Sequence, residues 1–447
     1  MMSLAFSPRR SRRALAIAAL AGASALVVSG CSSSGGDDGD TVTIVVQQQA
    51  NWEAMMGTLV PAFEEEYPNI KVELSTIDQE TRSSTNTQII AGNNPPDIAL
   101  VAGNSPVYLE TVENDELLDL TDVWEAADLY DRYDSETATA LQYGDTPYLV
   151  GIAGINYSIV YYNVDIFDEL GLSAPADNRL ASDADLFALT DAVRDAGYDP
   201  LAVGGADAFQ WVWQVSQLLQ SYATPEEITN YLTSWNVDVE PTVSYTDPPF
   251  VDTLERLQTW ADAGVYQDGY LGQDYDTAQA LFFQGQAAML LGGNFTAGSV
   301  DDNGAGFEYD WFLLPAGDDE RPAQLMTYLG EAMAIPAGAA HPDEAKLFLE
   351  FWMSNEMQAD AVANSGFALP SVNSLDIEEL PGITGVVSEL VEDANAYGAP
   401  IGWGSATPGA FAQQPLGTDV GAMLSGQMSA LEVAEGQQAR LDEIHAQ

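Results

Sequence analysis

Apolar residues beyond position 40 follow two different spacings. The run "TVTIVVQ" (41–47) is rich in β-branched residues and bounded by polar ones, which is typical of a strand buried on both faces of a sheet. In "EAMMGTLVPAFEEEYP" (53–68), Met55, Leu59 and Phe63 recur every four residues. This spacing predicts an amphipathic helix that buries one face.

Two more strands are predicted by the apolar runs "IKVEL" (70–74) and "DIALVA" (97–102). An order of strand, helix, strand, helix, strand predicts a parallel sheet covered by helices, and therefore the α/β class. The segment "HPDEAKLFLEFWM" (341–353) has acids near its start and an apolar face, which again predicts a helix. No long linker rich in proline or serine interrupts residues 41–447, so two lobes would be joined by short crossings.

The amino-terminal region has a different pattern. Four arginines within the first 13 residues precede an apolar run at 14–28. This order is typical of an export signal, and the run is shorter than the roughly 20 residues that span a bilayer. Small residues follow, and then Cys31, the only cysteine, so no intrachain disulfide can form. A buried helix that ends in a core cysteine is the alternative interpretation.

The string "VSGC" (28–31) resembles the lipobox of bacterial lipoproteins, in which signal cleavage leaves a lipidated amino-terminal cysteine. The resemblance implies a signal peptide at 1–30, a lipid anchor on Cys31 and a flexible polar tether at 31–40. The protein is then expected to be exported and anchored to the outer face of the cell membrane. The paired arginines also resemble a twin-arginine signal, and the general secretory route stays open.

The net charge of the chain limits the classes of molecule that it can bind. The chain has 13 Lys and Arg against 68 Asp and Glu, a formal net charge of −55. Such a surface repels phosphate groups, so no nucleic acid partner is expected. Hydrophobic residues make up 46% of the chain, which is ordinary for a folded protein, so a packed core is expected despite the charge. The charge also suggests adaptation to a salty medium, where screening relieves self-repulsion.

Candidate binding residues lie at the ends of the predicted strands, because ligands of open α/β sheets bind beyond the carboxyl ends of the strands. The loop after the first strand offers Gln49, Asn51 and Trp52, and the loop after the third offers Asn104. Amides hydrogen-bond hydroxyl groups and a flat aromatic ring covers an apolar surface, so these residues are suited to a sugar. Trp52 as a residue of the core is the alternative.

Three tryptophans further along the chain are candidates either to face the ligand or to pack in the core. In "DAFQWVWQ" (207–214), Trp211 and Trp213 are two residues apart and cannot share a helix face, so we expect one to pack and one to face ligand; we favour Trp211 for the ligand. Asp207 is expected either to accept ligand hydroxyl groups or to cap the helix. Trp403 lies between glycines in "IGWGS", which predicts an exposed loop and an accessible ring.

Several strings occur in an order that is more informative than any one of them. They are "FEEEYPNIKVEL", "IIAGNNPPDIALV", "LLDLTD", "IVYYNVDIFDELGL", "FFQGQAAMLLGGNF", "GEAMAIPAGAAHPDEAKLFLEFWMSNEMQ" and "GFALP". Their shared order, over residues 41 to about 374, resembles the extracellular solute-binding proteins of family 1. These are the carbohydrate-binding components of bacterial ABC importers, among which maltose-binding protein is the best-known relative.

The resemblance implies an α/β protein of two lobes with mostly parallel sheets, joined by a hinge of several crossings. The lobes and crossings would fall at 41–153 plus 332–367, at 154–328 plus 368–447, and near 153, 330 and 368. The implied function is capture of a carbohydrate, in particular an oligosaccharide, in a cleft between the lobes, followed by delivery to the permease subunits of an ABC importer. A monomer without cofactor, metal or enzymatic activity is expected.

The resemblance also suggests site residues. The family often places a ligand contact just before its "YYN" strand, which makes Asn156 and Tyr157 candidates. "GGNF" aligns with a family Gly-x-Trp stretch whose aromatic residue stacks on sugar, so Asn294 and Phe295 are candidates, with phenylalanine in place of tryptophan. Glu331 lies at the second crossing, where glycine is commoner, and is a candidate ligand contact or hinge carboxylate.

Other chemistries have less support in the sequence. The two histidines lack metal-ligand spacing, and the acidic stretch that begins at Asp301 has Phe312 where a calcium loop needs glutamate. No Gly-rich phosphate loop with its lysine is present, so the chain is not the ATPase of an importer. With 68 acids, a cell-surface glycosidase stays an alternative. A cleft with carboxylates and one aromatic residue would favour a non-sugar solute such as a polyamine.

Overall fold

The computed structural model describes most of the chain beyond residue 40, and residues Thr41–Gln447 form one compact unit. The described residues are 41–49, 52–77, 81, 85–103, 105–237, 239–297, 300, 306–317, 321–365, 369–380, 383, 385–403, 407, 411 and 413–446. The predicted signal peptide, Cys31 and the tether lie outside them, as do Asn51 and Asn104.

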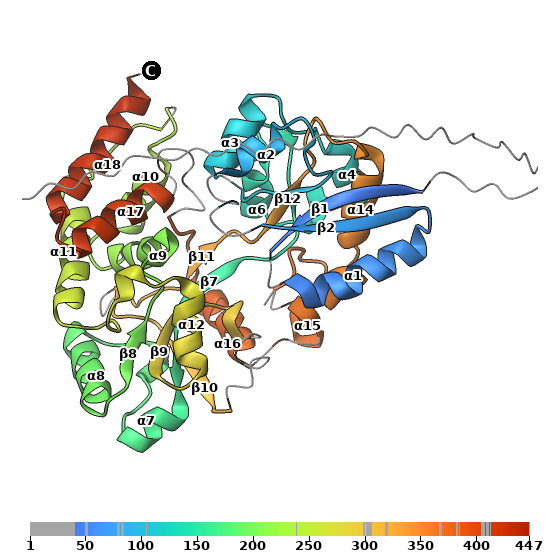
Figure 1. Ribbon diagram of the computed structural model, residues 1–447. Coiled ribbons are helices and arrows are strands. Elements are labelled where there is room, and N and C mark those ends of the chain that lie inside the picture. Colours follow the sequence, from blue (N-terminus) through green and yellow to red (C-terminus); the bar gives the residue numbers. More distant parts are fainter. Residues whose placement is uncertain are drawn as a thin grey trace, which may run out of the picture. The chain divides into compact units, whose positions relative to one another are not determined.

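A first group of strands begins with β1 (Val42–Gln48), which pairs in parallel with β2 (Ile70–Thr76), as the apolar runs predict. A parallel bridge from β1 reaches the residue before β3 (Ala99–Leu100). In contrast, β12 (Ala332–Ala334) joins β3 to β6 (Val150–Gly151) through antiparallel pairs. A strand from late in the chain thus completes a sheet that early residues begin (Figure 1).

Helices cover this first group. The predicted helix is α1 (Glu53–Glu66), which buries Met55, Leu59 and Phe63 and continues through the exposed Pro61. The other helices and a small hairpin that accompany it are α2 (Asn86–Ile90), α3 (Pro106–Glu113), α4 (Thr121–Ala126), α5 (Leu129–Arg132), α6 (Ser135–Ala140), β4 (Gln142–Tyr143), β5 (Thr146–Pro147), α14 (Pro342–Trp352) and α15 (Asn355–Ser365).

A second group of strands is centred on β7 (Asn156–Asn163). One edge of β7 pairs with β9 (Ala287–Gly293), and the other pairs with β10 (Tyr309–Phe312) and β11 (Met326–Tyr328), all three antiparallel. Only β8 (Asp199–Ala202) adds a parallel pair, to β9. The sheets of the described chain are therefore mixed, and the expectation of mostly parallel strands is wrong. Long-range antiparallel pairing is not encoded in local apolar spacing.

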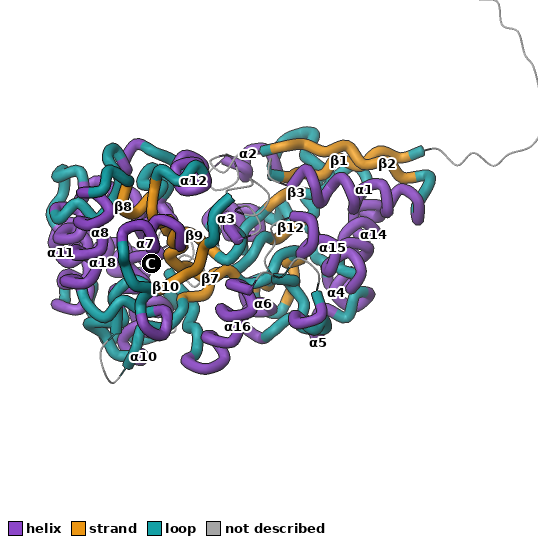
Figure 2. Tube along the Cα trace, turned by 90° about the horizontal axis from the view of Figure 1, so that it is seen from below, coloured by secondary structure: helices purple, strands orange, loops and turns teal. Residues whose placement is uncertain are grey.

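Strand β7 is buried on both sides, because helices cover both faces of this second sheet. Val160 and Tyr162 pack into one face and Ile159 and Tyr161 into the other, as the period of two requires. The helical elements here are α7 (Val164–Leu170), η3 (Ala176–Asn178), α8 (Asp183–Asp195), α9 (Ala208–Leu219), α10 (Pro225–Thr233), α11 (Pro248–Asp262), η4 (Tyr270–Gly272), α12 (Tyr275–Phe283), η5 (Ile377–Glu379), α16 (Gly385–Tyr397), α17 (Gln413–Leu424) and α18 (Ala430–His445). Figure 2 labels α7, α8, α10, α11, α12, α16 and α18 among them.

Two sets of buried side chains result. The first core draws on residues 44–152 and 332–372. The clusters around the second sheet draw on residues 157–328 and 369–441. The chain passes from one set to the other between β6 and β7, between β11 and β12, and again after α15, where Leu369 packs with the second set and Val372 with the first.

Candidate functional site

Aromatic side chains converge where β8 and β9 end. This aromatic cluster consists of Phe209 and Trp213 on α9, Tyr275 at the start of α12, Phe295 after β9 and Tyr328 at the end of β11. The Trp213 ring lies 5.0 Å from both the Phe209 and Tyr328 rings, measured between centroids, and 6.3 Å from Phe295. Phe209, Tyr275 and Phe295 are half-buried as residues, whereas Trp213 and Tyr328 are buried. The cluster presents flat apolar surfaces at a strand-end position.

Glycines allow these rings to approach. A Cβ atom on Gly293 would collide with the ring of Phe295, and one on Gly292 would lie 2.9 Å from the Tyr275 hydroxyl. A Cβ on Gly204 would lie 2.5 Å from the backbone of Tyr275. The "GGNF" turn therefore lets Phe295 fold back over its own strand, and the loop before α9 lies directly against the start of α12.

Asp207 is the candidate carboxylate that contacts this cluster. It occupies the position before α9 but makes no side-chain cap bond there. Instead its Oδ2 accepts a hydrogen bond from the backbone N–H of Tyr275 at 2.8 Å. Burial raises the pKa of Asp207, opposed by that hydrogen bond. The expectation that Asp207 caps its own helix is wrong, because the carboxylate holds the start of α12 beside the aromatic cluster.

Asn294 holds backbone in place. Its Oδ1 accepts from the Tyr157 N–H at 2.9 Å and its Nδ2 donates to the Ile155 carbonyl at 3.2 Å, while the side chain is fully buried. Tyr157 is also buried, and burial, followed by the charge of Asp134, raises its pKa to about 12. The half-buried Asn156 pairs in register with Tyr328. Asn294 and Tyr157 thus stabilise the start of β7 next to the cluster.

The two tryptophans of α9 pack in different clusters, but both are buried, and Trp211, the one favoured for the ligand, is the more deeply buried. Trp211 is buried in the core, where Nε1 donates to the Gly205 carbonyl at 2.9 Å and the ring lies 5.6 Å from that of Tyr266. Gly205 has no Cβ, and this space admits the indole. Trp213, 5% exposed, is the one that joins the aromatic cluster.

Trp403 is completely buried, so the prediction of an exposed loop is wrong. Its backbone N–H donates to Ser216 Oγ at 3.0 Å, and its Nε1 donates to the Phe411 carbonyl at 2.9 Å. The preceding Gly402 lies against Tyr328, since a Cβ there would be 2.5 Å from the tyrosine ring. This glycine marks a close approach between two segments rather than an exposed turn.

Candidates from the first group of strands are dispersed. Trp52 is 1% exposed and packs edge-to-face on Trp352 with centroids 6.2 Å apart, so the alternative of a core residue describes its position. Gln49 is half-buried, and its carbonyl accepts from the Trp52 N–H at 3.1 Å. At the crossing between β11 and β12, the Glu331 carbonyl accepts from the Ile152 N–H at 2.8 Å. The Glu331 side chain is half-buried.

A buried amide pair escaped the sequence analysis. Gln47, on β1, exchanges two side-chain hydrogen bonds with Asn86, with distances of 3.0 and 2.9 Å. Asn86 also donates to the Leu100 carbonyl at 2.8 Å, and Gln47 Oε1 accepts from the Leu100 N–H at 2.9 Å. The pair fixes the ends of β1 and β3 relative to each other. Its only sequence signal was the run of glutamines at the end of the first strand.

The structure therefore brings together Asp207, Phe295 and Asn156 from the predicted set. It adds four rings that were not predicted as ligand contacts, those of Phe209, Trp213, Tyr275 and Tyr328. A small cavity of about 10 Å³ lies beneath Trp213, lined also by Gln214, Gln217 and Ser158. A separate hollow of about 420 Å³ is lined by Arg132, Asn355 and other residues near the first group of strands.

The described residues show neither a metal-binding cluster nor a membrane-spanning helix. No three His, Cys, Asp or Glu side chains among them gather closely enough to hold a metal ion. Within the same part of the chain, no helix is long and apolar enough to cross a membrane.

Comparison with known proteins identifies relatives with the same organisation. The chain is 25% identical to the xylose/arabinose-binding protein XacG of Haloferax volcanii, over 84% of this chain and 79% of that one. An uncharacterized ABC transporter extracellular-binding protein of Pyrococcus horikoshii is 23% identical, over 79% and 76%. Among solved structures, a chitin oligosaccharide binding protein superposes with a TM-score of 0.74 at 21% identity, over 92% of this chain and 100% of that one.

The structural match establishes the two-lobed α/β fold of periplasmic binding proteins. The two sets of buried side chains described above are consistent with this organisation, and we call them lobe 1 and lobe 2. The model of the bacterial extracellular solute-binding proteins matches residues 46–359, which is most of the chain. On this match, the protein belongs to the bacterial extracellular solute-binding protein family.

Proposed function

We propose that the protein captures a carbohydrate, and more specifically an oligosaccharide, at the aromatic cluster of lobe 2. The observation that supports this most directly is the convergence of five aromatic residues, three of them half-buried, at the ends of strands. Ligand pockets combine such apolar and aromatic surfaces with a few fixed polar groups. Asp207 accepts a hydrogen bond from the Tyr275 N–H, and Asn156 pairs with Tyr328, so both polar residues lie beside the cluster. The names of XacG and of the chitin oligosaccharide binding protein point to the same ligand class.

Lobe closure would complete the site. The passages between lobes near 153 and 330 are proposed as parts of the hinge, together with the predicted crossing near 368, which lies outside the described residues. The second passage is tightly packed, because a Cβ on Gly330 would collide with the carbonyls of Ala153 and Gly154. A ligand that contacts both lobes stabilises the closed form by its higher affinity for that form. Gln49, near the end of β1, is the described lobe 1 candidate for such contacts.

The family match supports a proposal for the cellular role. We propose an exported, monomeric protein that a lipid on Cys31 anchors to the outer face of the membrane, and that delivers its ligand to the permease of an ABC importer. Neither nucleic acid nor a cofactor has a part in this role, and the protein is not an enzyme. Membrane fractionation tests the anchor: Cys31→Ala is expected to release the protein into the soluble fraction, and membrane retention of this variant would refute the lipid attachment.

A ligand screen tests the binding function. Thermal unfolding of the purified protein is followed with xylo-, chito- and malto-oligosaccharides, with pentoses, and with spermidine as a non-sugar cation, since a ligand that binds only the folded form raises the melting temperature. A shift with one class of glycan is expected. A shift with spermidine and none with any glycan would refute the carbohydrate function and favour the polyamine alternative.

The aromatic cluster is then tested with the identified glycan. Trp213→Ala removes the central ring of the cluster. The free energy of binding, measured by calorimetry, is expected to weaken by about 2 kcal/mol or more, the cost typical of a hot-spot residue truncated to alanine. Trp211→Ala is the matched control, because it lies on the same helix but in the core. An unchanged affinity in Trp213→Ala would place the ligand elsewhere.

A further inference from the structure

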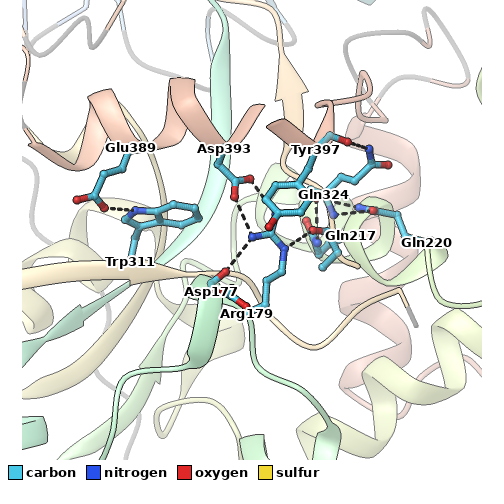
Figure 3. Close-up of polar contacts among 10 residues, drawn as sticks. Asp177, Arg179, Gln217, Gln220, Trp311, Gln324, Glu389, Asp393 and Tyr397 are labelled. Carbon is cyan, nitrogen blue, oxygen red and sulfur yellow. Dashed lines mark hydrogen bonds and ion pairs between the residues drawn. The ribbon is translucent and has the colours of Figure 1, made fainter. Parts of the chain in front are cut away.

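One arginine in lobe 2 joins three segments that are far apart in the sequence (Figure 3). Arg179 Nε donates to the Ala323 carbonyl at 2.7 Å, and Nη1 donates to the Asp177 carbonyl at 2.9 Å. Its two terminal nitrogens bind both oxygens of Asp393 on α16, at 2.8 and 2.9 Å. The guanidinium also lies 4.2 Å from the centroid of the Tyr397 ring. The side chains of Arg179 and Asp393 are only 11% and 10% exposed.

The contacts of Arg179 hold α16 against the second sheet. One turn before Asp393, Glu389 accepts from Trp311 Nε1 at 3.1 Å, so two acidic residues four positions apart face the sheet. Val387 and Leu390 are buried in the same hydrophobic cluster as Trp311. Bidentate pairing of arginine with carboxylate fixes orientation as well as distance, so Arg179 sets the position of the end of α16.

The segment after α16 runs beside a strand that carries a ring of the aromatic cluster. The Thr327 N–H donates to the Pro400 carbonyl at 2.9 Å, and the Gly402 N–H donates to the Thr327 carbonyl at 2.8 Å. Thr327 is followed by Tyr328, and Gly402 lies against its ring. The position of residues 399–402 therefore determines where Tyr328 can lie.

A second connection links Tyr397 to α9, the helix that carries Phe209 and Trp213. The Gln324 side chain donates to the Tyr397 carbonyl (Figure 3). The backbone of Gln324 is in turn held by α9: its N–H donates to Gln220 Oε1 at 2.9 Å, and its carbonyl accepts from Gln217 Nε2 at 3.2 Å. The end of α16 is thus connected to two of the elements that form the aromatic cluster.

We propose that Arg179 is a positioning residue for ligand binding. It makes no contact with the aromatic cluster, and it acts by fixing Asp393 and Tyr397, which place residues 399–402 beside β11 and so orient Tyr328 against Trp213. Removing the arginine leaves the buried Asp393 carboxylate without its partner, and the end of α16 shifts to hydrate it. This inference rests on the proposed function of the aromatic cluster.

Affinity measurements on matched variants test the inference. Arg179→Ala is expected to weaken binding of the glycan identified in the screen about tenfold, within the range that remote positioning residues produce. Arg179→Lys keeps the charge but loses the bidentate geometry, and is expected to give a smaller loss. Arg256→Ala is the control, because Arg256 makes a similar half-buried bidentate pair with Asp183 and contacts the Pro315 carbonyl. Its affinity is expected to stay within twofold of the wild-type value.

Hydrogen exchange supplies a readout that does not depend on ligand. The amides of Thr327 and Gly402 are expected to exchange faster in Arg179→Ala than in Arg256→Ala, with both variants compared at equal global stability. Equal affinity in Arg179→Ala and wild type, equal losses in the two alanine variants, or unchanged exchange at these amides would overturn the positioning role. If no glycan binds the wild type, the proposed function fails, while the exchange comparison still decides whether Arg179 controls β11.

Discussion

Replacement of Trp403 by alanine distinguishes a structural residue from a ligand contact. The indole is fully buried, and its ring centroid lies 5.5 Å from that of Tyr245 and 5.8 Å from that of Phe250. Truncation of a buried aromatic residue removes about 3–5 kcal/mol of stability through lost burial and the cavity left behind. The Phe411 carbonyl also loses its donor, Trp403 Nε1. We therefore expect Trp403→Ala to lie at the upper end of this range, at about 5 kcal/mol.

A second substitution separates the two contributions. Trp403→Phe keeps most of the ring packing but removes the N–H, so the expected loss is about 1–3 kcal/mol, that of an unsatisfied buried carbonyl. Both variants are measured by urea unfolding followed by circular dichroism, with the midpoint and slope fitted separately. Ligand affinity at low temperature, where the variants stay folded, is expected to match wild type. A Trp403→Ala variant that is as stable as wild type but binds glycan poorly would refute the assignment of Trp403 to the core.

Three other predictions concern the site and the surface. Gly293→Ala is expected to weaken glycan binding several-fold in calorimetry, because its Cβ would displace the Phe295 ring; Gly272→Ala, where no atom lies within 4 Å of the added Cβ, is the control. Burial raises the pKa of Asp207 above its ordinary value of 3.8, so its stabilising contribution is present below that pH and is lost as the pH rises through the folded-state pKa. Asp207→Asn is thus expected to gain relative stability in urea unfolding at pH 7 compared with pH 3.5, and a constant difference between the two pH values would contradict this sign. Because the net charge is −55, the melting temperature is expected to rise from about 0.1 to 1 M KCl, where the Debye length falls from about 10 to 3 Å, and an unchanged value would refute self-repulsion as a limit on stability.

Local sequence pattern predicted the first strands and helix of lobe 1 because each is determined by its own spacing. The run at β1 and the four-residue repeat of α1 need no distant partner to be recognised. The pairing of strands in the second sheet could not be predicted in this way. The central strand β7 was visible as an apolar string, but its antiparallel partners β9, β10 and β11 lie more than 120 residues further along. Strand direction in such pairs depends on chain topology, which apolar spacing does not specify.

In the candidate site, too, some features follow from local spacing and others depend on residues distant in the sequence. Sequence spacing correctly required Trp211 and Trp213 to face different surroundings, but it could not decide which ring packed in the core. That choice is made by Gly205, whose carbonyl accepts from the Trp211 indole, and by Tyr328, which lies on a strand more than 100 residues away. The meaning of a glycine in the sequence was similarly ambiguous. Gly402 was expected to mark an exposed loop, but it allows its segment to pack closely against the Tyr328 ring.

Two asparagines hold backbone groups in place: Asn294, which the sequence made a candidate ligand contact, and Asn86, which it did not single out. Asn294 in lobe 2 and Asn86 in lobe 1 are both completely buried, and both hydrogen-bond backbone groups of neighbouring strands. Their hydrogen-bonding groups are therefore occupied before any ligand arrives, and they contribute by holding the loops in one conformation. A preorganised site loses less conformational entropy on binding. It follows that ligand affinity should depend mainly on the ring surfaces of the aromatic cluster, and that substitution of Asn294 should act on binding only through the position of β7.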